Sequence, residues 1–374
     1  MVSKVRSFLI SLFIALLLME GSSYLLVHRG WIDTDLPTYS LKNGRSEFRV
    51  ETDPFFGAWH PPHVTYFQNR TCYEAKVAYH TNAFGMRDPE RVLSVENPRA
   101  VVLGDSFVEG YGVPEGKRIS DLLEKARGFE HLNFGVAGMG PAQELLLYQS
   151  LAKKFSHSEV MVGIFPRNDF MEDDYEVWKT RGRYRPFFVG KYPDYQLVYS
   201  GKKPGGESPS LRRHVTRFLR EFSYTYTVVY TVLYYRQIGD FFRTKSQEGD
   251  SYAGYYDFNE EEWNRMRYAL EKIHDDAEGR RMTVILIPSI QDFHRYGQKG
   301  NPPLSERMKE FGKQHGVGIV DLLPGLYESG NWEKYYHLPC DPHLNEAGDA
   351  LAAQLILSAL EAPKTSGVFK KNAP

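Results

Sequence analysis

A serine, a histidine and an aspartate occur in short polar motifs that together could perform nucleophilic catalysis. Ser106 lies in the motif Gly104-Asp105-Ser106-Phe107, and His343 lies in Asp341-Pro342-His343 near the C-terminus. A serine hydroxyl is a weak nucleophile until an adjacent base takes its proton, and histidine is the usual base. A neighbouring carboxylate fixes the tautomer of that histidine. We therefore predict that Ser106 is the nucleophile, His343 its base and Asp341 the acid that orients the base.

Two further motifs contain groups that could stabilise an oxyanion. Attack on an ester carbonyl creates negative charge on oxygen, which requires N–H donors directed at it. Gly138 follows the segment 133–137, and a glycine lets a backbone N–H approach a substrate without a Cβ in the way. Asn168 carries a side-chain amide that can donate a second hydrogen bond. The predicted oxyanion hole consists of the Ser106 N–H, the Gly138 N–H and the Asn168 amide.

Each motif has a simpler interpretation when it stands alone. Asp and Ser favour turns, so Asp105 and Ser106 could form a plain turn. Asn168 could cap a helix, and His343 could be an ordinary surface histidine. We expect Asp105 and Asp169 to brace their loops through local hydrogen bonds rather than to react. The order of the motifs along the chain is what favours catalysis.

The segments between these motifs alternate between apolar runs and amphipathic stretches. Strands are predicted at 101–103, 131–134, 160–165, 282–288 and 318–322, and helices at 116–127, 142–154, 260–278, 304–315 and 346–360. Such alternation predicts right-handed crossovers, and hence a three-layer α/β/α fold with a mostly parallel five-stranded sheet. Active sites in such sheets form outside the carboxyl ends of the strands, where all the motifs fall. Asn345 is the predicted N-cap of the final helix.

The order Gly-Asp-Ser, Asn…Gly, Asn-Asp and Asp-x-His is similar to that of the SGNH (GDSL-like) hydrolase superfamily, over about residues 98–362. The resemblance implies a flavodoxin-like α/β/α domain, the site roles given above, and chemistry without a metal or another cofactor. Two positions depart from the family pattern. Many members place the acid three residues before the histidine, where this chain has Cys340, and some bacterial members show the spacing of Asp341. Pro166 replaces the usual glycine of the third motif.

The N-terminus resembles a membrane anchor. Lys4 and Arg6 precede the apolar runs 8–19 and 24–27, which Glu20 and three small residues separate. Together the runs comprise roughly the 20 residues that a helix needs to cross a bilayer. Basic residues before the span favour a cytoplasmic N-terminus and export of the remainder. We expect a single-pass anchor in a bacterial-type inner membrane with a periplasmic or extracellular catalytic domain; the alternative is a cleaved signal and a secreted protein.

The whole chain is expected to divide into four parts. Residues 1–28 form the anchor or signal and 29–97 an irregular N-terminal extension. Residues 98–362 form the hydrolase domain, with a helical insertion at about 171–255, and 363–374 form a disordered tail. The insertion is dense in arginine and tyrosine. It either packs on the sheet domain or serves as a lid or interfacial helix that contacts acyl chains or lipid headgroups.

Charge and cysteine content exclude some classes of protein. A formal net charge of −1 gives no support to nucleic-acid binding, which needs a concentrated positive field. The only cysteines, Cys72 and Cys340, exclude a disulfide-dense scaffold and a four-cysteine zinc site. Whether these two form a disulfide stays open at this point.

The leading hypothesis is hydrolysis of an acyl or acetyl ester through an acyl-Ser106 intermediate outside the cytoplasm. The expected substrate is a lipid, an acylated glycan or a small ester. An alternative is an O-acyltransferase or deacetylase that modifies an exopolysaccharide or cell-envelope glycan. Such acyltransferases often carry Asp-x-His ahead of the serine motif, whereas Asp341 and His343 lie behind it, and this order favours the hydrolase. A third alternative is an inactive envelope scaffold that kept the fold.

Overall fold

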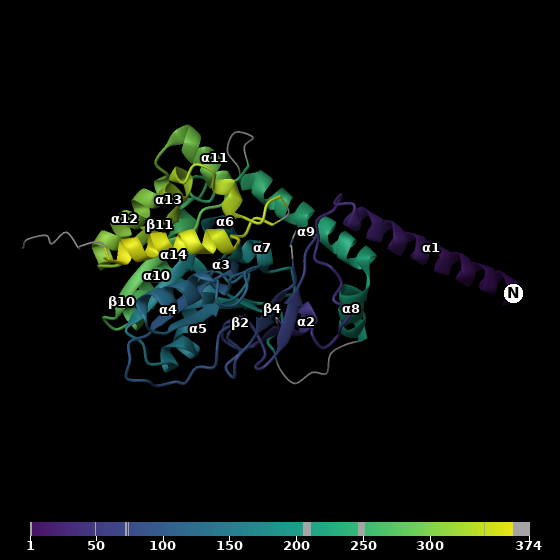
Figure 1. Cartoon of the computed structure of the whole chain (residues 1–374), viewed down its shortest axis with the longest axis horizontal. Helices are drawn as coiled ribbons and strands as arrows, with labels where there is room; N and C mark the ends of the chain where they lie inside the picture. Colours follow the sequence, from purple (N-terminus) through teal and green to yellow (C-terminus); the bar gives the residue numbers. More distant parts are fainter. Residues whose placement is uncertain are drawn as a thin grey trace, which may run out of the picture.

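The computed structural model describes residues 2–48, 50–71, 73, 75–204, 211–245, 251–339 and 341–361. An α/β body contains a five-stranded sheet, from which one long helix, α1 (Val2–His28), projects (Figure 1). The strands are β5 (Ala100–Gly104), β6 (His131–Gly135), β7 (Glu159–Ile164), β10 (Arg281–Leu286) and β11 (Gly318–Asp321), in the order β11-β10-β7-β5-β6. Every neighbouring pair is parallel. The predicted fold class is confirmed.

Helices cover both faces of this sheet, which explains why its central strands are buried apolar runs. On one face α4 (Ile119–Arg127) packs against α14 (Glu346–Glu361). On the other face α5 (Pro141–Ser150) packs against α10 (Glu260–Asp276), and α12 (Pro303–His315) lies along β11.

Most predicted elements are present, with shifted ends. The helix predicted to begin at 116 begins at Ile119, because the Asp121 carboxylate accepts hydrogen bonds from the Gly116 and Arg118 N–H groups and holds that segment as a turn. The helix predicted at 142–154 ends at Ser150, and η1 (Ala152–Lys154) follows. The helices that were not predicted include α11 (Ile290–Lys299) and α13 (Leu322–Glu328).

The N-terminal extension contains short elements that its composition does not reveal. A one-turn helix, α2 (Arg45–Phe48), precedes two antiparallel pairs of strands. These pairs are β1 (Val50–Asp53) with β2 (Gly57–Trp59), and β3 (Thr65–Gln68) with β4 (Val77–His80). Phe48, Tyr66, Val77 and Tyr79 form a small buried cluster of their own. The extension is therefore a packed unit.

The segment predicted as a helical insertion also holds a β hairpin. It contains the short helix α7 (Tyr175–Trp178), the strands β8 (Arg185–Lys191) and β9 (Asp194–Ser200), and the helices α8 (Leu211–Phe222) and α9 (Tyr224–Lys245). The predicted boundaries at 97 and 362 stay predictions. The predicted tail at 363–374, Cys72 and Cys340 lie outside the described residues.

Helix α1 is long and apolar enough to cross a membrane over Lys4–His28. Most of its side chains from Lys4 onward are exposed, and among these only Ser23 and Val27 are buried. Its second half packs against α9, which lies between α1 and the α/β body in Figure 1.

Candidate active site

The predicted site residues gather at the carboxyl edge of the sheet. β5 ends at Gly104, and Ser106 then begins the one-turn helix α3 (Ser106–Glu109). β6 leads into the turn that holds Gly138, and β7 leads into α6 (Pro166–Glu172), which holds Asn168 in its first turn. Pro166 occupies the start of α6, where a proline is well tolerated because no N–H is needed there.

Ser106, His343 and Asp341 form a continuous chain of hydrogen bonds. The Ser106 Oγ lies 2.8 Å from the His343 Nε2, and the His343 Nδ1 lies 2.5 Å from the Asp341 Oδ1. Because Asp341 is an acceptor, the proton of the neutral ring resides on Nδ1 and leaves Nε2 free to accept the serine proton. The fold therefore brings together the three side chains that the sequence predicted to act as a unit.

Asp341 is fully buried but held in its charged form. Burial alone would raise its pKa, but His343, the Arg70 guanidinium and the Tyr73 hydroxyl outweigh burial and hold the pKa of Asp341 well below its usual range. Tyr73 donates to the Asp341 Oδ2 at 2.6 Å, and Arg70 donates to the same oxygen at 3.3 Å. The sequence gives no signal for these two donors, since they lie in the N-terminal extension, far along the chain from Asp341.

The His343 ring is held by aromatic neighbours and by its own loop. Ring centroids of Phe107 and Tyr111 lie 5.0 and 4.4 Å from that of His343. The His337 N–H donates to the His343 carbonyl at 2.9 Å. The Asn345 Oδ1 accepts from the Ala347 and Gly348 N–H groups at 3.0 Å, which confirms Asn345 as the N-cap of α14. The loop that carries Asp341 and His343 is therefore fixed to the start of the long helix α14.

Asp105 orients the Asn168 amide. One Asp105 carboxylate oxygen caps α3 by accepting the Phe107 N–H at 2.9 Å, and the other accepts the Asn168 Nδ2 at 2.9 Å. The amide retains a second hydrogen for another acceptor. Burial is the main influence on the Asp105 carboxyl and raises its pKa to about 6, although both hydrogen bonds favour the charged form. The expectation that Asp105 braces its loop is confirmed.

The turn that holds Gly138 is also fixed by a buried carboxylate. The Ala137 N–H donates to the Glu109 Oε2 at 2.5 Å. Gly138 has a φ of +70°, a conformation that favours glycine. At Gly135 a Cβ would lie 2.2 Å from the Glu109 backbone nitrogen, so only glycine permits this approach of α3 to β6.

Three more carboxyl groups lie buried near Asp105. Asp169 accepts the Phe165 N–H at 2.7 Å, as expected for a bracing residue, and Asp173 accepts the Ala142 N–H. Glu144 is fully buried, and neither of its oxygens has a hydrogen-bond partner among the described residues. Burial, with repulsion from the neighbouring acids, raises the pKa of Glu144 and of Asp169 well above their usual values, and burial raises that of Asp173 to about 7.

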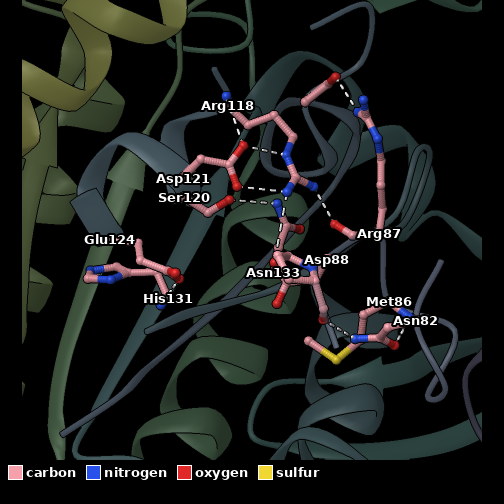
Figure 2. Close-up of polar contacts among 12 residues, drawn as sticks. Asn82, Met86, Arg87, Asp88, Arg118, Ser120, Asp121, Glu124, His131 and Asn133 are labelled. Carbon is pink, nitrogen blue, oxygen red and sulfur yellow. Dashed lines mark hydrogen bonds and ion pairs between the residues drawn. The ribbon is translucent and has the colours of Figure 1, made fainter. Parts of the chain in front are cut away.

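A buried arginine from the N-terminal extension supports the segment that follows Ser106. The Arg87 guanidinium donates to the carbonyl oxygens of Glu109, Gly110 and Val113 at 2.8, 2.6 and 2.6 Å. Figure 2 shows the Arg118 side chain directed at Asp121 and at the Arg87 carbonyl, and Asn133 close by. The extension thus contacts the end of α3 through Arg87, and it contacts Asp341 through Arg70 and Tyr73.

No family model matches the chain, and no curated protein matches it either. Among solved structures, the chain is similar to a lipolytic protein of the G-D-S-L family from Veillonella parvula, with 14% identity, a TM-score of 0.35, and 70% of this chain and 97% of that chain covered. It is also similar to the lipase/acylhydrolase from Enterococcus faecalis, with 14% identity, a TM-score of 0.37, and 72% and 100% covered. A carbohydrate esterase family 2 enzyme from Corynascus thermopiles matches with 12% identity, a TM-score of 0.36, and 76% and 70% covered. These values are low, so the functional conclusions rest on the contacts within this chain.

Proposed function

We propose that this protein is a serine esterase that cleaves carboxylic esters through an acyl-Ser106 intermediate. The observation that carries the proposal is the hydrogen-bonded chain from Ser106 through His343 to the charged Asp341, with separations of 2.8 and 2.5 Å. Proximity alone does not activate a serine, but a neutral imidazole whose free nitrogen faces the hydroxyl does. The low pKa of Asp341 keeps its carboxylate charged, and that charge stabilises the imidazolium that forms during attack.

The proposed reaction has two halves. In the first, the His343 Nε2 takes the Ser106 proton while Oγ bonds to the ester carbonyl carbon, and the imidazolium then returns that proton to the leaving alkoxide as the ester C–O bond breaks. In the second, His343 takes a proton from water, which attacks the acyl carbon, and the proton passes back to Oγ as the acid leaves. Both halves generate an oxyanion, for which the Ser106 N–H, the Gly138 N–H and the Asn168 amide are the proposed donors.

We also propose that α1 is retained as a single span of a bacterial-type inner membrane, with the α/β body on the periplasmic or extracellular side. Lys4 and Arg6 favour a cytoplasmic N-terminus. Ser23 and Val27 are 7% and 2% exposed, because this end of α1 packs on the body of the protein. Cleavage after the apolar segment would remove these buried side chains, so retention fits the packing better than secretion.

The test is hydrolysis of a chain-length series of esters, from acetyl to long acyl, by the full chain in detergent. The wild type should release acid, and Ser106→Ala should not. An oligosaccharide acceptor added to the same assay separates the two enzymatic hypotheses: constant acid release supports the esterase, and diversion of the acyl group to the sugar supports the acyltransferase. Hydrolysis that survives Ser106→Ala would contradict the role of Ser106, and no turnover of any ester would contradict the proposal and favour the scaffold hypothesis.

A further inference from the structure

Helix α8 presents its apolar face to the outside of the protein. Leu211, Val215 and Phe218 recur at intervals of four and three residues, so they share one side of the helix. Their exposed fractions are 78%, 48% and 52%. A helix on the surface of a soluble protein normally turns such a face toward the core. α8 therefore exposes the apolar side chains that a helix at a water-facing surface would normally bury.

The polar side of α8 faces the protein instead. Arg217 donates to the Leu41 carbonyl at 2.7 Å, and the Arg220 guanidinium lies 5.1 Å from the centre of the Tyr230 ring. Glu221 is buried and accepts the Thr38 hydroxyl at 2.6 Å. These contacts fix the rotation of the helix about its axis, so the outward apolar face is a consequence of specific bonds.

Helix α9 repeats this arrangement beside α8. Val229, Val232 and Leu233 are exposed by 49%, 52% and 53%. The opposite side carries Thr227, which is buried, and Thr231, whose hydroxyl is 2.7 Å from that of Thr34. Two neighbouring helices thus expose apolar side chains while they turn polar groups toward the protein.

Glu20, the acidic residue within the apolar N-terminal segment, joins these helices to α1. Its carboxylate accepts hydrogen bonds from the Ser223 hydroxyl at 2.8 Å and from the Tyr224 and Thr225 N–H groups at 2.5 and 3.2 Å. Those N–H groups begin α9, where a negative charge is favourable. Glu20 therefore ties α1 to the start of α9, and α9 contacts both α1 and α8 (Figure 1).

We propose that these two faces form a membrane-docking surface for an anionic phospholipid bilayer, defined by Leu211, Val215, Phe218, Val229, Val232 and Leu233. Because Glu20 ties the start of α9 to α1, the surface cannot move far from the bilayer that α1 enters. The exposed Arg212 flanks the apolar face of α8, and the exposed Trp31 follows the end of α1. Arginines beside an apolar helix face bind acidic headgroups, and tryptophan prefers the interface.

The docking surface deepens the proposed membrane anchoring and rests on it. It predicts that the body of the protein lies against the bilayer, with α8 and the first half of α9 at the level of the headgroups and upper acyl chains. A second copy of this chain or another protein is a poorer occupant, because a protein partner would have to fit around a bilayer-spanning α1 at the same place.

The test uses the full chain in nanodiscs that contain phosphatidylglycerol and phosphatidylcholine, with the photoreactive residue p-benzoylphenylalanine at single positions. Phe218 and Val232 probe the docking surface. Phe13 in α1 is the positive control for anchoring, and the exposed Val92 of the N-terminal extension is the negative control. After irradiation, mass spectrometry of the protein detects lipid adducts. Ester hydrolysis by each variant is measured in parallel to report on the proposed esterase separately.

We expect lipid adducts at Phe13, Phe218 and Val232 and none at Val92. Replacement of phosphatidylglycerol by phosphatidylcholine, or Arg212→Glu, should reduce the Phe218 adduct several-fold and leave the Phe13 adduct unchanged. Adducts at Phe13 without any at Phe218 or Val232 would overturn the docking surface while preserving the anchor. Crosslinks from Phe218 to a protein chain would overturn it in favour of a protein partner. Loss of the Phe13 adduct as well would contradict the anchoring itself.

Discussion

Two buried aspartates, one on each side of the proposed active site, have opposite environments. Asp341, behind the base, is surrounded by Arg70, Tyr73 and His343, and its pKa lies well below the usual range. Asp105, behind the Asn168 amide, lies near other carboxyl groups, and burial raises its pKa to about 6. The base side is therefore built to hold a negative charge. On the proposed oxyanion side, burial raises the pKa of Asp105 while the hydrogen bonds from Phe107 and Asn168 favour its charged form, and the carboxylate orients the Asn168 amide.

The largest effect is expected at the reacting pair, the Ser106 Oγ and the His343 Nε2. Ser106→Ala or His343→Ala should each lower kcat by about 10⁶-fold, because serine and base work as one unit. The double variant should lose little more than either single variant. Multiplicative losses in steady-state ester hydrolysis would mean that the two residues act independently.

Exchange of each aspartate for asparagine compares the two sides directly. Asp341→Asn should reduce kcat by about 10⁴-fold, since the amide neither fixes the correct tautomer nor stabilises imidazolium. Asp105→Asn should cost less, about 10–100-fold, because the single oxygen of asparagine can still cap α3, whereas its amide nitrogen cannot accept the hydrogen bond from the Asn168 Nδ2. Equal losses of kcat in the two variants would erase the distinction.

Removal of the proposed oxyanion donor tests the other side. Asn168→Ala should lower kcat by about 10²–10³-fold with a smaller change in KM, because the hydrogen bond strengthens only as charge develops. Asn259→Ala is a suitable control, since this asparagine caps α10 by accepting the Glu262 N–H and is not among the predicted site residues. A near-normal kcat for Asn168→Ala would remove its amide from the reaction.

The contribution of the N-terminal extension should be smaller and visible in the pH profile. The proposed reaction needs a neutral imidazole at His343, and Asp341 stays ionised throughout the profile because its pKa is depressed. Tyr73→Phe removes a hydrogen bond to a charged group and should reduce kcat/KM about tenfold. Arg70→Met removes a positive charge beside Asp341. Because the Asp341 carboxylate then stabilises the imidazolium more strongly, the acid limb of the pH–activity profile should move to higher pH.

Tyr199→Phe serves as the matched control for Tyr73→Phe, because the Tyr199 hydroxyl contacts only the Phe55 carbonyl oxygen among the hydrogen bonds of the described chain. An acid limb that moves to lower pH in Arg70→Met would contradict the charge argument.

The smallest effect concerns stability rather than rate. Burial raises the pKa of Glu144 well above its usual value, so the folded protein binds a proton at this carboxyl more tightly than the unfolded chain does. Stability should therefore fall as pH rises from about 4.5, the unfolded value, toward the raised folded value. Glu144→Gln removes the titration and should flatten this dependence, measured as the Tm of the full chain in detergent between pH 5 and 8. An unchanged pH dependence would show that Glu144 does not contribute.

The sequence predicted the sheet and the principal motifs because both depend on local patterns. Apolar runs that end in Gly104 or Phe165 identify the strands, and parallel strands bring the residues after them to one edge. Arg70 and Tyr73 could not be predicted, because their roles depend on packing between the extension and a loop near the other end of the chain. The contacts of Glu20 could not be predicted for the same reason, since its partners lie at the start of α9.

Covalent trapping tests the central claim most directly. The full chain is treated with a fluorophosphonate, digested and analysed by mass spectrometry. The account predicts one adduct on the peptide that carries Ser106, no adduct in Ser106→Ala, and greatly slowed labelling in His343→Ala. An adduct that persists in Ser106→Ala, or a wild-type protein that is not labelled at all, would contradict it.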